Sequence, residues 1–334
     1  MAFQLKIWDH CRYVQDKLRP YDEMARHLDT MAKAGISATI IYMPEVISLD
    51  DYCRAAQAAG LAVEARIFPA WDNIHAVMRT LPEADFLDME KRFGIRLAGS
   101  CGNDPGTRAG FLAAAEQLAT EYADRIEAIH LDFIRNDNAL LLMDYPCQCA
   151  ACQALYRRFL GCAVPDKTML RDPAVLYKLL AIRNENVTRT VRAMREMTGK
   201  HGLKLTMAAR ANYLNSRDIT DPPVWGLGPA VLEGQDWAAW HDEGLFDGIY
   251  PMNYHTDLEL FRSVLADHLR LIPDHRERLF SGVGISSSMG EVTPQGAAQH
   301  LALVRDAGLP GAVLFNKTNI YSAEFRAVFR EFTA

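Results

Sequence analysis

Residues 127–135 read EAIHLDFIR, and this stretch decides the fold class. Its apolar and aromatic residues suit a buried parallel strand, and Asp132 and Arg135 close it with polar side chains. Seven further runs of the same kind occur along the chain, so eight strands are expected. They span residues 4–10, 37–44, 62–70, 127–135, 203–211, 246–254, 278–286 and 311–319.

Longer amphipathic stretches alternate with these runs, and several end in Gly, as helices often do. This alternation predicts βα units around a parallel sheet, and eight such units make an α/β (β/α)8 TIM barrel. The chain is 49% hydrophobic and has no repeat, low-complexity tract or linker, so a single domain over residues 1–334 is expected. The expected helices span residues 22–34, 50–59, 107–124, 173–199, 256–271 and 294–307.

The connection from the fourth to the fifth strand is the irregular one. Residues 136–202 form a long insertion that holds three cysteines of one cluster and an extra helix. Insertions of this length in a barrel usually carry function.

The net charge of −6 and the absence of any Lys/Arg block argue against nucleic acid as a partner. No apolar run of 18 residues occurs, and the N-terminus has no hydrophobic signal region, so a cytoplasmic protein without a membrane partner is expected. The sequence leaves the oligomeric state open, a homo-oligomer included.

Polar residues close most of the expected strands, and the chemistry of a barrel takes place at the carboxyl ends of its strands. Carboxylates and guanidinium groups bind sugar hydroxyls through charge-assisted hydrogen bonds, and Trp side chains stack on sugar faces. A small carbohydrate is therefore the expected substrate. The side chains expected to orient it are Arg66, Arg135, Arg210, Trp237, Asn253 and Tyr254.

Cys147, Cys149 and Cys152 follow a C-x-C-x2-C spacing directly ahead of an amphipathic run. Cytoplasmic thiols stay reduced, so a tight group of cysteines favours a metal over disulfides.

Four motifs together resemble uncharacterised, family-10-like glycoside hydrolases. They are IEAIHLDFIR at 126–135, the cysteine-rich segment leading into CQALYRRFLG at 152–161, GQDWAAWHDEGLFDGIYPMNY at 234–254 and GVGIS at 282–286. The resemblance covers roughly residues 95–290 and implies a barrel with glycosidic-bond chemistry.

The cysteine segment also resembles that of family 42 β-galactosidases, in which a more distant cysteine completes a structural zinc site. This resemblance implies that Cys101, Cys147, Cys149 and Cys152 bind a structural Zn²⁺, since four thiolates suit tetrahedral zinc. The catalytic pair of family 42 is missing. Its first position reads Arg135-Asn136-Asp137, and Glu291 is a weak substitute near the seventh strand.

Family 18 chitinases offer a partial match, because HLDFI and MNY correspond in part to their strand-four and strand-six motifs. Asp132 matches the middle Asp of the first motif, but Ile134 occupies the position of the catalytic Glu. A glycosidase generally needs two carboxyl groups. Asp132 is expected to be one of them, and its alternative role is a buried structural partner of Arg135 or Arg210.

Asp236 is the expected second carboxylate, because it precedes the sixth strand on a loop beside an aromatic residue. Asp137 and Glu64 are the alternatives. Asp236 could equally be the N-cap of the helix that follows it, which is a common role for Asp.

Two other functions stay open. One is a metal-dependent sugar isomerase or lyase, for which His10, Glu64, His130, Asp132 and His255 supply suitable ligand types. The other is a catalytically inactive carbohydrate-binding barrel. The sugar, its anomer and the retaining or inverting outcome are not readable from the sequence.

Overall fold

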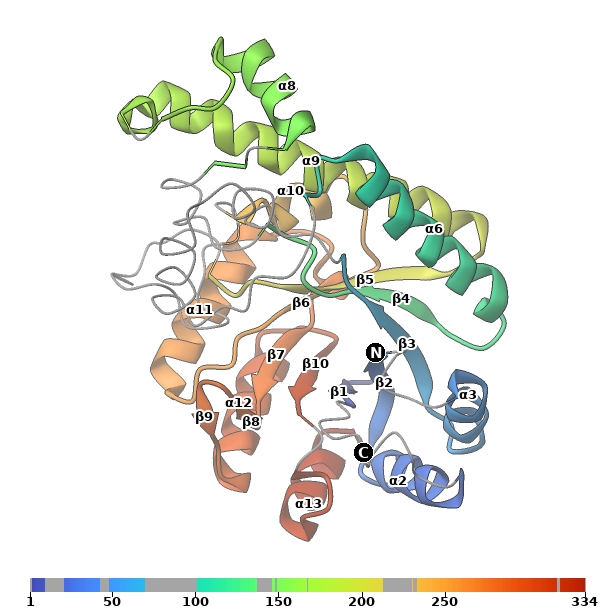
Figure 1. Cartoon of the computed structure of the whole chain (residues 1–334). Coiled ribbons are helices and arrows are strands. Elements are labelled where there is room, and N and C mark those ends of the chain that lie inside the picture. Colours follow the sequence, from blue (N-terminus) through green and yellow to red (C-terminus); the bar gives the residue numbers. More distant parts are fainter. Residues whose placement is uncertain are drawn as a thin grey trace, which may run out of the picture.

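Eight parallel strands form one sheet that bends into a nearly closed barrel, shown in Figure 1. They are β1 (Gln4–Trp8), β2 (Ile36–Tyr42), β3 (Ala62–Ile67), β4 (Ala128–Leu131), β5 (Lys204–Ala209), β6 (Gly248–Pro251), β7 (Ser281–Gly284) and β10 (Gly311–Phe315). Their order in the sheet is β6-β5-β4-β3-β2-β1-β10-β7. A parallel bridge between Ile249 and Leu279 joins the two edges, so the predicted TIM barrel is confirmed.

The computed structural model describes residues 2–9, 21–42, 48–69, 101–136, 146–147, 149–166, 168–212, 230, 233–316 and 319–333. Each of the eight expected strands is present, and β4, β5, β6 and β7 end two to four residues before their expected carboxyl ends. Asp132, Arg210 and Asn253 therefore lie just beyond the sheet.

Helices surround the sheet, and the six that the sequence pattern predicts are found within about two residues of their expected ends. They are α2 (Tyr21–Lys33), α3 (Leu49–Ala58), α6 (Pro105–Tyr122), α9 (Pro173–Lys200), α11 (Leu258–Leu271) and α12 (Pro294–Asp306). The structure also contains α8 (Ala150–Leu160), α10 (Trp237–Asp242), α13 (Ala323–Thr333), two 3-10 turns (Met169–Arg171 and Arg276–Arg278) and a small hairpin of β8 (Ser286–Ser287) and β9 (Gly290–Glu291). None of the helices among the described residues is long and apolar enough to cross a bilayer.

The strands are buried on both faces, because helices cover the outer face of the sheet and side chains fill the barrel inside it. On β1, Leu5 and Ile7 belong to the outer core between sheet and helices. Trp8 points the other way, into an inner core that it shares with Ile40, Ala208, Tyr250, Phe280 and Val313. Inward side chains of several strands thus fill the barrel.

The insertion after β4 makes a second, smaller core. Cys101, Cys147, Cys152, Tyr156, Leu170 and Leu179 pack together there. The second half of α9 instead packs on the barrel through Val187, Val191 and Met194. Figure 1 shows α8 and the start of α9 projecting beyond the barrel. The helix α9 therefore joins the two cores.

Candidate active site at the carboxyl ends of the strands

Asp132 lies immediately after β4 and is 6% exposed. Its Oδ2 accepts hydrogen bonds from Arg66 Nε at 2.8 Å and Arg66 Nη2 at 2.6 Å, and its Oδ1 accepts one from Phe133 N at 2.8 Å. Phe133 has a φ of 51°, a left-handed conformation that is unfavourable for a side chain other than Gly. Such strain, of about 1–3 kcal/mol, clusters at functional sites.

The charge of Asp132 follows from these neighbours. Burial alone would raise the pKa of its carboxyl, but the charges of Arg66 and Arg135 outweigh burial and hold that pKa below its usual value. Asp132 is therefore a carboxylate at neutral pH. This suits a nucleophile or a stabiliser of positive charge, and it does not suit a proton donor.

A second carboxylate, Glu233, was missed by the sequence analysis. Arg210 Nε and Nη2 bind its two oxygens at 2.7 and 2.9 Å, and Arg135 Nε lies 3.2 Å from its Oε2. Glu233 lies in the loop ahead of α10. In the sequence, only its position directly before the GQDW stretch at 234–237 could have pointed to it. Glu233 is 1% exposed.

These groups form a row of alternating charge, Arg66, Asp132, Arg135, Glu233 and Arg210, which we call the arginine–carboxylate row. Asp132 and Glu233 are its two anions, and Arg135 acts on both of them. The row joins β3, the ends of β4 and β5 and the loop before α10. The structure thus brings together all three arginines that the sequence singled out.

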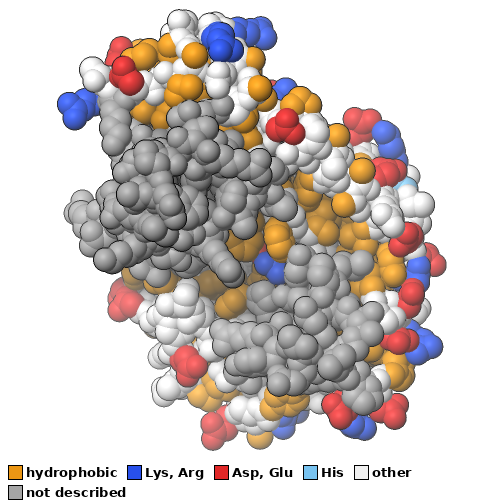
Figure 2. Space-filling view, viewed as in Figure 1, with side chains coloured by type: hydrophobic (Ala, Val, Ile, Leu, Met, Phe, Trp, Pro, Cys, Tyr) orange, Lys and Arg blue, Asp and Glu red, His pale blue; other side chains and the backbone are white. Residues whose placement is uncertain are grey.

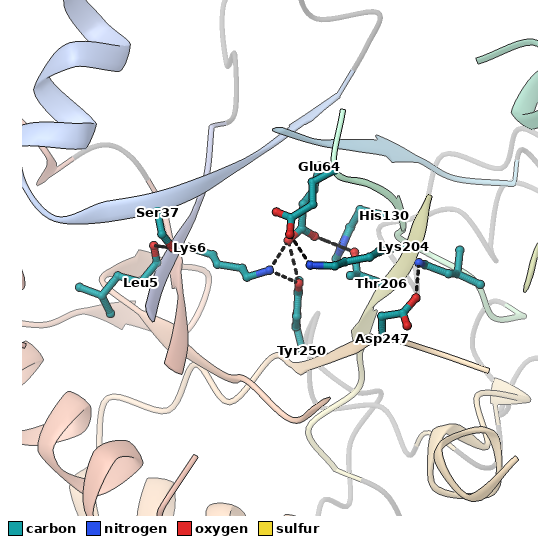
Figure 3. A network of polar contacts seen from close by, with 11 residues as sticks. Leu5, Lys6, Ser37, Glu64, His130, Lys204, Thr206, Asp247 and Tyr250 are labelled. Carbon is teal, nitrogen blue, oxygen red and sulfur yellow. Dashed lines mark hydrogen bonds and ion pairs between the residues drawn. The ribbon is translucent and has the colours of Figure 1, made fainter. Parts of the chain in front are cut away.

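A second polar network lies inside the barrel beneath this row (Figure 3). Lys6 Nζ lies 2.5 Å from Glu64 Oε1 and donates to Tyr250 OH at 2.8 Å. Thr206 Oγ1 donates to Glu64 Oε2 at 2.6 Å, and His130 Nδ1 lies 2.9 Å from that hydroxyl. Burial would raise the pKa of Glu64, yet Lys6 and the hydrogen bonds around it hold that pKa well below its usual value.

Glu64, one of the alternatives for the second catalytic carboxylate, is held by this network. Glu64 has no exposed surface, and both of its oxygens are bound by side chains of the barrel interior. His130 is likewise fully buried, between Trp8 and Tyr250. Both residues therefore hold the barrel interior together, which is also why they do not offer a metal site for an isomerase.

Tyr254 lies beside Asp132 at the end of β6. Its ring stacks on Phe315 at a centroid distance of 4.9 Å, and a Cβ on Gly284 would lie 2.8 Å from the Tyr254 Cβ. Gly282 and Gly284 of β7 therefore leave the space that this ring fills. Burial and the charge of Asp132 raise the pKa of Tyr254, so its hydroxyl stays protonated.

Two of the predicted site residues, Trp237 and Asn253, have other contacts. Trp237 has no exposed surface and donates its Nε1–H to the Arg210 carbonyl at 3.1 Å, so the predicted stacking face is not available to a sugar. Asn253 is fully buried and donates to the Phe261 carbonyl at 3.0 Å. Both side chains support the loops behind the site.

Asp236 is half-buried and caps α10, because its Oδ1 accepts from Ala239 N at 3.3 Å. Its capping role, one of the two expected from the sequence, is present. Glu291, the weak substitute near the seventh strand, lies in the exposed hairpin and accepts from Ser286 Oγ at 3.0 Å. His10 and Asp137 lie outside the described residues.

The four predicted cysteines come together in the second core. Their Sγ atoms all lie within 4.8 Å of one another, and Cys101 Sγ is 3.5 Å from Cys152 Sγ. Three of the four side chains are buried. Asn103 Nδ2 donates to Cys152 Sγ and Cys152 N donates to Cys149 Sγ, at 3.3 and 3.4 Å. The set can bind a metal ion.

The geometry fits tetrahedral coordination. Four thiolates about 2.3 Å from a zinc ion have sulfur–sulfur separations of roughly 3.8 Å, close to the spacing seen here. N–H groups directed at sulfur stabilise thiolates, as the groups around metal ligands usually do. Elsewhere in the described ranges, no three His, Cys, Asp or Glu ligand atoms gather in this way.

Comparison with solved structures places the barrel among glycoside hydrolases in fold. The glycoside hydrolase domain of PgaB (BpsB) from Bordetella bronchiseptica has a TM-score of 0.68 at 12% identity, with 100% of this chain and 99% of that chain covered. A chitinase from Chromobacterium violaceum gives 0.58 at 11% identity, covering 100% and 99%. The catalytic domain of a β-amylase from Paenibacillus polymyxa gives 0.59 at 10% identity, covering 99% and 97%.

No protein-family model matches the chain, and no curated protein matches it. The likenesses to solved structures show the fold alone, because the identities are so low. The resemblances to family-10-like hydrolases and to family 42 β-galactosidases are not confirmed by them and stay predictions.

Proposed function

We propose that this protein is a glycoside hydrolase that acts on a small oligosaccharide or glycoside at the carboxyl ends of its strands. The observation that carries the proposal is Asp132, a buried carboxylate fixed after β4 by two bonds from Arg66 and one from Phe133. A buried anion is costly unless it is paired, and the strain at Phe133 adds to that cost. The neighbours in fold that are glycoside hydrolases support the same chemistry.

In the proposed reaction, Asp132 is the ionised group that stabilises the oxocarbenium-like transition state or attacks the anomeric carbon. Arg66 and Arg135 keep it charged and oriented. Asp236, the half-buried carboxyl group at the start of α10 and the second carboxylate expected from the sequence, is proposed as the proton donor to the leaving oxygen. Tyr254 remains protonated beside Asp132 and can donate a hydrogen bond to the sugar.

The test is hydrolysis of a panel of α- and β-aryl glycosides by the wild type and by Asp132→Asn. We expect the substitution to lower kcat/KM by at least about a hundredfold, the lower end of what a positioned acid or base contributes. Turnover that Asp132→Asn leaves intact would contradict the assignment, and no turnover by the wild type on any glycoside would contradict the function.

Asp9→Asn is the matched control. Asp9 follows β1, is also buried, and accepts hydrogen bonds from His27 Nε2 at 3.0 Å and Tyr52 OH at 2.7 Å. Those partners lie on α2 and α3, outside the barrel. Neutralising Asp9 removes a buried carboxylate that is bonded to two of the outer helices, and it should leave kcat/KM within a few-fold of wild type.

We further propose that the four cysteines bind a structural Zn²⁺. Four thiolates leave no coordination position open, so the ion would stabilise the insertion and take no part in the reaction. Elemental analysis of the purified protein should find one zinc per chain, and Cys152→Ser should lower that content. Zinc that stays bound in Cys152→Ser, or a protein purified without any metal, would contradict the proposal.

A further inference from the structure

A chain of three hydrogen-bonded side chains lies outside the arginine–carboxylate row. Asp9 follows β1, His27 lies on α2, and Tyr321 precedes α13. His27 Nε2 is 3.0 Å from Asp9 Oδ1, and His27 Nδ1 is 2.6 Å from the Tyr321 hydroxyl. We call these residues the Tyr321 triad. Their order is that of a hydroxyl nucleophile, its base and the carboxylate that orients the base.

The hydrogen bonds determine where the protons of this triad lie. An ionised carboxylate only accepts hydrogen bonds, so Asp9 accepts one from His27 Nε2–H and one, at 2.7 Å, from the Tyr52 hydroxyl. A neutral His27 with its proton on Nε2 has a lone pair on Nδ1, and this lone pair accepts the Tyr321 O–H. His27 is therefore placed as a base toward the Tyr321 phenol.

The base and the nucleophile of the triad differ in their access to solvent. Asp9 and His27 are buried, whereas Tyr321 is 53% exposed. The Tyr321 backbone is held by Arg326 of α13, whose Nη1 donates to the Ile320 and Tyr321 carbonyls at 3.2 and 2.6 Å. Ile320 belongs to the outer core. An exposed tyrosine thus stands on an anchored segment, with a buried histidine bound to its hydroxyl.

The charges around the triad favour a neutral reagent over an anionic one. The two helices beside it, α2 and α13, carry four basic side chains (Arg26, Lys33, Arg326 and Arg330) and five acidic ones (Asp22, Glu23, Asp29, Glu324 and Glu331). Acidic and basic side chains are interspersed along the lower edge of Figure 2, where Figure 1 places α13. A phosphoryl donor, which carries several negative charges, gains no attraction here, whereas an uncharged acyl ester needs none.

We propose that Tyr321 is a nucleophile that takes up an acyl group from neutral, activated esters, with His27 as its base. The phenol oxygen forms a bond to the ester carbonyl carbon, and its proton passes to His27 Nδ1. The bond from that carbon to the alcohol oxygen of the ester breaks. The leaving oxygen keeps the electron pair and receives the proton from His27, so the products are an O-acyl tyrosine and the free alcohol. Asp9 orients His27 and stabilises the imidazolium between the two proton transfers.

The test is acetylation of the wild-type protein by 4-nitrophenyl acetate, which contains no glycosidic bond. Peptide mass spectrometry over time gives the acetylation rate of each tyrosine. Tyr177 of α9 is the internal control, because it is 73% exposed and makes no hydrogen bond within the described part of the chain. We expect Tyr321 to react at least about tenfold faster than Tyr177, since a positioned base contributes about 10²–10⁴-fold. Equal or slower acetylation of Tyr321 overturns the proposal.

Two substitutions test the role of His27. In His27→Gln, the side chain can still accept the Tyr321 O–H but cannot take up its proton, so the rate at Tyr321 should fall to that at Tyr177. Tyr52→Phe is the matched control, because it removes the other hydrogen bond to Asp9 and leaves His27 in place, and it should keep the faster reaction at Tyr321.

Circular dichroism confirms that both variants fold, and the wild-type rates alone decide the proposal if His27→Gln does not. A faster reaction at Tyr321 that persists in His27→Gln overturns the assignment of the base. Its loss in Tyr52→Phe as well would make the effect one of packing and would overturn that assignment too. Hydrolysis of glycosides is an independent readout, since Asp132 and Glu233 are not members of the Tyr321 triad.

Discussion

Single side chains in this barrel owe their roles to the partners that surround them. Asp9, Glu64, Asp132 and Glu233 are all buried carboxylates, yet only the last two lie in the arginine–carboxylate row. Asp9 is bound by the outer helices, and Glu64 by Lys6 in the barrel interior. Burial and acidity alone therefore do not identify a catalytic group, since the neighbouring charges decide what each carboxylate can do.

Asp236 has two possible roles, N-cap of α10 and proton donor, and substitutions at this residue can distinguish them. Asn is as good an N-cap as Asp, so Asp236→Asn should leave the stability of α10 nearly unchanged. Asp236→Ala should lose about 1 kcal/mol of unfolding free energy with the cap. If Asp236 donates the proton, both variants should lose at least about a hundredfold in kcat/KM on substrates with poor leaving groups.

The readouts are urea unfolding and steady-state kinetics. Full activity in Asp236→Asn, with the loss of stability confined to Asp236→Ala, would show that Asp236 is a cap alone. Glu233 would then be the remaining carboxylate of the row to test as the partner of Asp132.

Among the helices, α9 packs both on the barrel and on the smaller core of the insertion. Its 28 residues span about 42 Å. Val187, Val191 and Met194 anchor the second half on the barrel, while Leu179 anchors the first half beside the cysteines. The smaller core has few apolar residues, so little hydrophobic burial is available to hold α8 in place.

Metal removal should therefore act on one part of the molecule. Chelation, or Cys152→Ser, is expected to expose α8 and the first half of α9 to protease while the barrel keeps its strands. Limited proteolysis with mass spectrometry locates the cuts, and far-ultraviolet circular dichroism follows the barrel. Cys53→Ser is a control, since this buried cysteine lies on α3 and outside the cluster. Cuts spread over the whole chain would contradict a local role for the metal.

On β7, Gly284 sets the position of Tyr254. A Cβ at this residue would lie 2.8 Å from Tyr254 Cβ and 3.1 Å from its Cα, and neither atom can move without the backbone. Gly284→Ala should cost about 1–3 kcal/mol of stability by overpacking and should displace Tyr254 from Asp132. Thermal unfolding and kcat/KM measure the two effects. Gly110→Ala is the control, because a Cβ there meets nothing within 4 Å.

At the scale of the whole molecule, the closed barrel makes stability depend on pH through its buried carboxylates. Both Asp132 and Glu64 have pKa values below their usual ones in the folded protein, because cations face them despite the burial. The unfolded chain then binds protons more readily than the folded one does. Their contribution to stability is complete above the usual carboxyl pKa, near pH 4, and is lost as the pH falls toward the lower folded values.

These two groups should make the urea concentration at the unfolding midpoint fall steeply as the pH drops below about 4. Just above that pH, they should leave this concentration nearly constant. The double substitution Lys6→Met with Glu64→Gln removes one buried pair together and should make the acid dependence shallower. A pair replaced as a unit is tolerated better than a single buried charge left behind. An unchanged acid dependence in this variant would contradict the role of Glu64.

The sequence by itself determined the eight strands, six of the helices, the barrel and the C-x-C-x2-C segment of Cys147, Cys149 and Cys152, whereas Cys101 was expected only from the resemblance to family 42. These follow from short-range periodicity and spacing, as in EAIHLDFIR at 127–135, where apolar residues must be buried and Asp132 closes the run. Residues near in the chain set such patterns, so a single sequence reveals them. The strand-end arginines were also found, since a barrel gathers its strand ends at one face.

Only the tertiary structure decided how side chains pair. Glu233 meets Arg135 and Arg210 because a loop far from β4 returns to it, and no local pattern specifies that contact. The burial of Trp237 and the engagement of Glu64 by Lys6 depend in the same way on the packing of distant segments. The periodicity of the sequence determines which face of a strand or helix a side chain lies on. The closure of the barrel determines which side chains, and therefore which charges, lie next to it.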